Sequence, residues 1–310
     1  MHIPDGFLSP PVWVTFDALA VPAIGVMARR AHRDVEDRQI PLLGVMGAFV
    51  FAAQMINFPV GAGTSGHLVG GALLAIVLGP WAAALVMTAI LAMQAFLFQD
   101  GGILALGTNI CNMAIVGVFA GYLPYFLWGR GSSKARRSAA IFAGGVLSVL
   151  VSAALALSQL LISGVPMPRR LLLISMAVFF ASALIEGAIT LAAIRAIERL
   201  NPMWVRAPAE LRSPPVLFGV IFAVILGAAL AIAGVLLAST SPDGIEKILA
   251  TRGVITESKN FWEPSWMRRA LVSLAGIAGA FAVCLAVGKM LARRQRALIQ
   301  TAKQMRAGSA

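Results

Sequence analysis

Long apolar stretches recur along this chain and are separated by short polar segments. Nine of them approach the ~20 residues that a helix needs to cross a bilayer. They cover about 12–28, 40–57, 67–79, 81–98, 104–127, 138–162, 171–194, 215–238 and 270–291. The third is short and Gly79-Pro80 separates it from the fourth, so we expect it to reach only part-way across. The pattern predicts an all-α membrane protein with nine spans.

The spans fall into two units. Residues 1–195 hold seven spans with short connections, which predicts a seven-span helical bundle. Residues 196–214 are polar and rich in Arg and Pro, as is typical of a cytoplasmic linker. Residues 215–310 hold two spans around an outside loop at about 239–269, followed by a basic tail that we expect along the inner membrane surface.

Charge placement predicts the orientation. Only 12% of residues are charged, against about 25% in globular proteins. Most Lys and Arg residues lie in one set of alternate loops, which puts the N-terminus outside and the C-terminus in the cytoplasm. The net charge of +12 is therefore juxtamembrane, and we expect no nucleic-acid partner. The first basic residue is Arg29, so the N-terminus does not resemble a cleaved signal peptide. The predicted location is the cytoplasmic membrane.

Met1-His2 is the first candidate for chemistry. The terminal amine, the His2 amide and the His2 imidazole are three nitrogens that adjacent atoms can hold around one metal ion. Such a set favours a planar site suited to Ni(II) or Cu(II). The amine and the amide must lose protons, so binding should weaken as the pH falls. The following IPDGFLSPPVW has prolines and apolar side chains that favour packing into the bundle.

A second histidine on the same side can complete that site. His67 lies between the second and third predicted spans, outside like the N-terminus, and would supply a fourth nitrogen. Its glycine-rich surroundings, NFPVGAGTSGHLVGG, fit either a flexible turn or irregular backbone that lines a cavity. His32 lies in a charged inner loop and is expected to face either solvent or the lipid headgroups.

Other polar residues could support the metal ligands. Thr64, Ser65 and Asn109 are predicted neighbours that orient the ligands. Asp17 and Glu186 fall inside predicted spans, where carboxylates are functional candidates, but the sequence assigns neither a role.

The strings MHIPDGFLSP, TSGHLVGG and QAFLFQDGGILALGTNICNMAIVG resemble the substrate-binding M component of energy-coupling factor (ECF) transporters for nickel or cobalt. The resemblance covers most of residues 1–195. It implies a seven-span bundle with an inserted N-terminus and a planar Ni(II) or Co(II) site. The implied ligands are the Met1 amine, the His2 amide and imidazole, and the His67 imidazole.

SPDGIEK at 241–247 resembles a motif of the small two-span N component, which implies a natural M–N fusion. The resemblance also implies a transmembrane coupling (T) subunit and two ATPase subunits as partners. The sequence has no G-x-x-x-x-G-K-[ST] phosphate loop of its own. The predicted function is the substrate-binding subunit of an ATP-driven importer, not an enzyme, with Ni(II) or Co(II) as the transported ion and no cofactor.

Two other classes of function are compatible with a membrane protein of this kind. A stand-alone divalent-metal carrier or a metal-sensing membrane protein would need no ATPase partners. Metal uptake measured with and without the ATPase subunits would distinguish these functions from an ATP-driven importer. An intramembrane hydrolase would need a set such as H-E-x-x-H, which the sequence lacks. Cys111 and Cys284 lie inside predicted spans and suggest neither a disulfide framework nor a zinc cluster. Nickel and cobalt both remain open.

Overall fold

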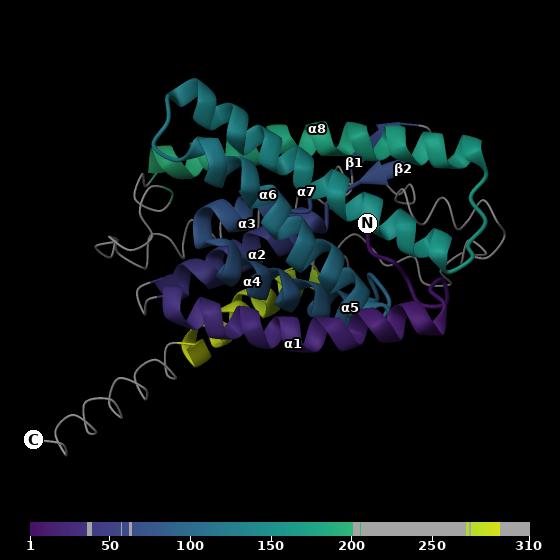
Figure 1. Ribbon diagram of the computed structural model, residues 1–310. Helices are drawn as coiled ribbons and strands as arrows, with labels where there is room; N and C mark the ends of the chain where they lie inside the picture. The colour runs from purple at the N-terminus through teal and green to yellow at the C-terminus, as the bar shows by residue number, and fades with distance from the viewer. Residues whose placement is uncertain are drawn as a thin grey trace, which may run out of the picture.

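The computed structural model describes residues 1–35, 39–56, 58–61, 64–200, 205, 271–272 and 274–291. Long helices lie side by side in a bundle, and α1 and α8 run along opposite faces of it in the view of Figure 1. The elements are α1 (Pro10–Asp34), α2 (Ile40–Gln54), β1 (Phe58–Gly61), β2 (Thr64–Gly66), α3 (Gly71–Leu78), α4 (Pro80–Met93), α5 (Leu106–Asn109), α6 (Val118–Pro124), α7 (Lys134–Ile162) and α8 (Arg169–Leu200), with π-helical turns η2 (Gln94–Phe98), η3 (Ile110–Gly117) and η4 (Tyr125–Gly129).

Six helical stretches in the described part are long and apolar enough to cross a membrane: Pro10–Asp34, Pro80–Phe98, Leu106–Gly129, Lys134–Ile162, Arg169–Leu200 and Leu274–Leu291. They correspond to six of the predicted spans, and α2 coincides with a seventh but is shorter. The chain is a multi-pass membrane protein. The predicted span 215–238, the linker and the outside loop lie outside the described residues, so the nine-span count, the domain boundaries and the orientation stay predictions.

The third predicted span is a half-helix. α3 has 8 residues, all of them buried, so it lies within the bundle. At ~1.5 Å per residue it is about 12 Å long, well short of a membrane crossing. It ends at Gly79, whose φ of 80° turns the chain, and Pro80 begins α4.

The glycine-rich segment before His67 departs from the predicted all-helical fold. β1 and β2 pair antiparallel, with Phe58 opposite Gly66 and an irregularity between Pro59 and Gly61. The described residues of this segment are therefore paired strands with one irregularity rather than a flexible turn, and whether their backbone lines a cavity stays a prediction. The membrane-crossing elements are helical, as predicted.

Buried polar side chains pair between helices. Asn112 and Gln159 exchange two hydrogen bonds of 2.6 and 2.8 Å, and Gln94 Nε2 donates to Gln54 Oε1 at 2.8 Å. Such pairs satisfy polar groups that have no water to bond within the membrane. They hold the long helices around α3 in a fixed arrangement.

Candidate metal centre

The N-terminal segment enters the bundle ahead of α1. Met1, His2 and Ile3 are 9%, 4% and 0% exposed. Asn109 binds both sides of the Ile3 backbone: its Oδ1 accepts from the Ile3 N–H at 2.9 Å and its Nδ2 donates to the Ile3 carbonyl at 3.1 Å. The Gly102 N–H donates to the same carbonyl at 2.9 Å. Hydrogen bonds to the backbone of Ile3 thus fix the N-terminal segment in place inside the bundle.

Two carboxylates hold the loop that follows η2 against this segment. Asp5 accepts from the N–H groups of Ile103, Leu104 and Ala105 at 2.9, 2.8 and 3.3 Å. Asp17 accepts from the Gly107 N–H at 2.7 Å. Both bind free N–H groups around the start of α5, where a negative charge is favourable. Asp17, unassigned from the sequence, therefore anchors the first turn of α5, which follows the loop that carries Asp100.

The terminal nitrogen of Met1 lies 2.9 Å from Nε2 of His67. The His67 Nδ1 lies 2.9 Å from the Leu68 carbonyl oxygen. Because that oxygen only accepts, Nδ1 must carry the proton, which leaves the lone pair of a neutral ring on Nε2. The His2 and His67 rings are stacked, with centroids 5.3 Å apart and an interplanar angle of 5°. The predicted ligand residues Met1, His2 and His67 are therefore neighbours in the structure, and the lone pair of His67 faces the Met1 amine.

His2 faces Asp100 through its ring. Its Nδ1 lies 3.0 Å from Asp100 Oδ1, and the Asp100 side chain is 38% exposed. Partial burial acts to raise the pKa of Asp100, but His2, His67 and the terminal amine outweigh it and lower the pKa below its ordinary value. Nε2 of His2 is buried and has no hydrogen-bond partner in the described part of the chain. Asp100 thus brings a negative charge to the cluster of nitrogens.

Glu186 positions the segment that follows His67. Its two carboxylate oxygens accept from the N–H groups of Val69 and Gly70, each at 2.8 Å, and its side chain is buried. Gln54 Nε2 donates to the Val69 carbonyl at 2.7 Å. The N–H groups of Val69 and Gly70 and the Val69 carbonyl are therefore satisfied inside the protein just before α3. The sequence marked Glu186 only as an intramembrane carboxylate.

Not every predicted residue joins the site. Asn109 lies next to it but binds the Ile3 backbone rather than a ligand nitrogen. Thr64 and Ser65 contribute the backbone of β2, and their side chains lie outside the described part. His32 is remote, with Nδ1 2.6 Å from the Leu291 carbonyl, so it is bonded rather than solvated. Where the structure is described, no three His, Cys, Asp or Glu side chains form a metal cluster.

Comparison with known proteins identifies the family of this chain. Residues 2–204 match the family model described as CbiM, cobalt uptake substrate-specific transmembrane region. The fused nickel transport protein NikMN of Rhodobacter capsulatus is 41% identical over 144 residues, 46% of this chain and 42% of that protein. The cobalt transport protein CbiM of Acetoanaerobium sticklandii is 36% identical over 155 residues, 49% of this chain and 62% of that protein.

The chain therefore spans about half the length of the curated relatives it matches. A crystal structure of a truncated transition metal transporter superposes with a TM-score of 0.55 at 30% identity. It covers 64% of this chain and 99% of that one, so the described helices adopt that transporter's fold.

Proposed function

The chain belongs to the family of cobalt-uptake substrate-specific transmembrane regions, and from that premise we propose that it is the metal-binding membrane subunit of a Ni(II) or Co(II) importer. The single observation that carries the proposal is the 2.9 Å separation of the Met1 amine and His67 Nε2. In the proposed site these two nitrogens bind one ion together with the amide and imidazole of His2.

The spacing of those two nitrogens fits a planar site. Two nitrogens at right angles, each ~2.0 Å from a metal, lie about 2.8 Å apart. The amine and His67 Nε2 are separated by 2.9 Å, which leaves room for an ion coordinated by both. The proton now shared between them would leave on binding.

The His2 ring must turn for the chelate to close. Only Nδ1 can form a small ring with the amide of the same residue, because Nε2 lies on the far side of the imidazole. Nδ1 now faces Asp100 at 3.0 Å. Binding therefore breaks that bond and leaves the carboxylate beside the charged complex. A doubly charged ion bound to a deprotonated amide keeps one positive charge, which Asp100 offsets.

The partners follow from the family rather than from contacts. We propose that the chain works with a coupling subunit and two ATPase subunits, since its sequence lacks a phosphate loop. Relatives named as fused nickel transport proteins support an M–N fusion, in which 215–310 forms the N-type unit.

Calorimetry with Ni(II) and with Co(II) tests the site. The full-length protein with its native N-terminus should bind one ion, and His67→Ala should abolish binding because one of four donors is lost. His32→Ala is the matched control, since His32 bonds to Leu291 far from the site. Unchanged affinity in His67→Ala would refute the four-nitrogen site.

Metal accumulation in cells tests the energy source. Cells expressing the chain with the coupling and ATPase subunits should accumulate more metal than cells expressing it alone. Equal accumulation would instead show a stand-alone carrier.

A further inference from the structure

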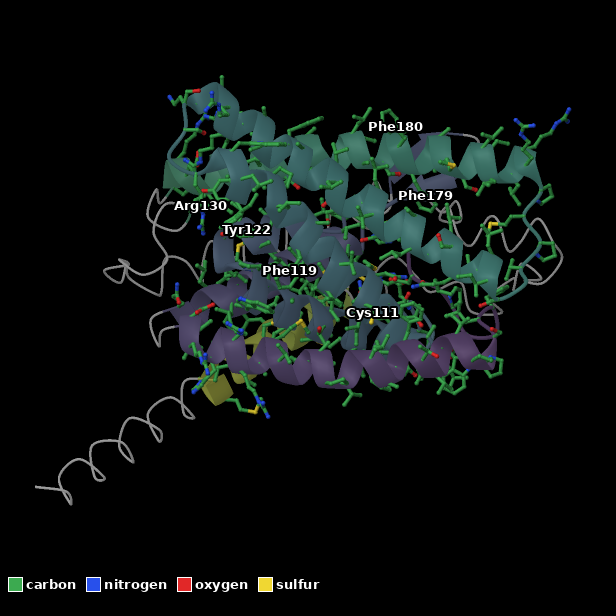
Figure 2. All side chains as sticks on the ribbon, viewed as in Figure 1. Cys111, Phe119, Tyr122, Arg130, Phe179 and Phe180 are labelled. Carbon is green, nitrogen blue, oxygen red and sulfur yellow. The ribbon has the colours of Figure 1, made fainter. Side chains whose placement is uncertain are left out.

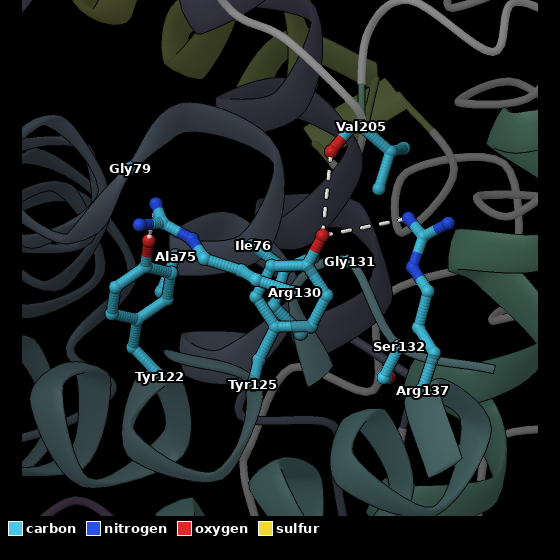
Figure 3. A pocket seen from close by; sticks show the side chains of 10 residues that line it. All are labelled: Ala75, Ile76, Gly79, Tyr122, Tyr125, Arg130, Gly131, Ser132, Arg137 and Val205. Carbon is cyan, nitrogen blue, oxygen red and sulfur yellow. Dashed lines mark hydrogen bonds between the residues drawn. The ribbon is translucent and has the colours of Figure 1, made fainter. Parts of the chain in front are cut away.

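A cavity of about 530 Å³ lies at the other end of the bundle from the N-terminal segment. The stretch Leu106–Gly129 crosses the bundle between the two: it starts beside Asn109, which binds Ile3, and ends at the cavity. Figure 3 shows two tyrosine–arginine pairs projecting from η4 and its neighbours around this cavity. By the predicted orientation this end faces the cytoplasm.

Arg137 and Arg130 differ in the groups that neutralise their positive charges. Arg137 forms an ion pair with Glu198 and donates to Tyr125 Oη at 3.5 Å. Arg130 donates to Tyr122 Oη and lies 5.5 and 5.4 Å from the ring centres of Tyr122 and Phe126. Within the described residues no carboxylate pairs with Arg130, which is exposed at its position after η4. Among the residues that the structure describes, its guanidinium is therefore a cation held in place without an anionic partner.

Apolar side chains lie on the surface beside that cation. Leu123, Phe126, Leu127 and Trp128 are 47%, 53%, 61% and 49% exposed on the last turns of this span. Figure 2 places Arg130 and Tyr122 together at this end of the bundle, away from Cys111. A free inorganic anion or an acidic side chain would use the cation alone. A phospholipid would use both, with its headgroup on the cation and its chains along the apolar surface.

We propose that this cavity binds the phosphate group of an anionic phospholipid through Arg130 and Tyr122. The planar guanidinium can donate two parallel hydrogen bonds to phosphate oxygens. The Tyr122 hydroxyl, which accepts from Arg130, has its own proton free to donate. Basic pockets between membrane helices on the cytoplasmic side bind such headgroups. The assignment is independent of the metal site.

Native mass spectrometry of the full-length protein, released from bilayers of phosphatidylcholine and phosphatidylglycerol, tests this proposal. Wild type should retain phosphatidylglycerol in preference to phosphatidylcholine. Arg130→Ala should retain it about fivefold less, as expected for the loss of one cation near an anionic lipid. Tyr122→Phe, which keeps the ring, should also lower retention. Arg136→Ala is the matched control, because it removes the same charge from an exposed position outside the cavity.

Two outcomes would overturn the proposal. Equal retention by Arg130→Ala and Arg136→Ala would mean that surface charge alone attracts the lipid. Arg130-dependent binding of inorganic phosphate in detergent, without retention of phosphatidylglycerol, would assign the cavity to a free phosphate. Nickel titration of each variant checks folding, since the metal site lies at the other end of the bundle.

Discussion

The terminal nitrogen of Met1 and Nε2 of His67 lie 2.9 Å apart across a sequence separation of 66 residues. Two independent sets of hydrogen bonds bring them together. Asn109 holds the backbone at Ile3, and Glu186 holds the backbone just after His67. Neither set involves the Met1 amine or His67 Nε2, so these two proposed donors are positioned before the metal arrives, whereas the His2 ring must still turn.

An extension of the N-terminus by Gly-Ser should abolish nickel binding. It converts the basic amine into an amide and forces two residues into a place where Met1 is only 9% exposed. Calorimetry should show an affinity at least about 100-fold weaker. The same two residues added after Ala310 are the control and should have no effect. Normal binding by the N-terminally extended protein would exclude the amine as a ligand.

Glu186→Ala should weaken metal binding and lower the melting temperature. It leaves the N–H groups of Val69 and Gly70 buried without an acceptor, at about 1–3 kcal/mol each. Because Val69 and Gly70 lie two and three residues after His67, the nickel affinity should fall about tenfold or more. Glu198→Ala, on the same helix but paired with Arg137, should leave the nickel affinity unchanged. Equal affinities in both variants would remove Glu186 from the positioning of His67.

Gly101→Ala should lower nickel affinity, whereas Gly6→Ala should lower only stability. Both glycines have positive φ, 94° and 89°, so each substitution costs about 1–2 kcal/mol in the backbone. A Cβ at Gly101 would lie 3.1 Å from His2 Cβ and 3.3 Å from Asn109 Nδ2, but one at Gly6 meets nothing within 4 Å. Thermal unfolding and nickel titration of both variants separate backbone strain from displacement of His2. A similar loss of affinity in both would contradict the contact.

Asp100→Asn should destabilise the metal-free protein at neutral pH and have no effect in strong acid. Burial acts to raise the pKa of Asp100, but its positive neighbours lower it below the ordinary 3.8. A carboxyl with a lowered pKa contributes stability above its unfolded value, and that contribution is lost as the pH falls through the folded value.

The melting temperatures of wild type and Asp100→Asn should therefore differ at neutral pH and converge below about pH 3.8. Asp34→Asn, an exposed carboxyl at the end of α1, is the control and should match wild type throughout. A difference that persists unchanged into acid would mean that the substitution acts through packing.

Local pattern predicted much of the fold. Apolar runs of sufficient length placed the long helices, and Gly79-Pro80 marked the end of the half-helix α3. The pairing of β1 with β2 escaped prediction because glycine-rich segments fit several backbone paths, and the pairing selects one of them. The role of Glu186 escaped prediction too, because the N–H groups that donate to it lie more than a hundred residues away in the sequence.

The sequence by itself determined which groups could bind a metal, because the chelating set at Met1-His2 is built from adjacent atoms and His67 carries the other imidazole on the expected side. Only the tertiary structure decided that the Met1 amine lies beside His67 Nε2, since Asn109, Glu186 and Asp5 act across long sequence separations that no local pattern records. It also decided that Asp100 faces His2. Adjacent residues are close because they are covalently linked, whereas hydrogen bonds between distant segments form only when the chain folds.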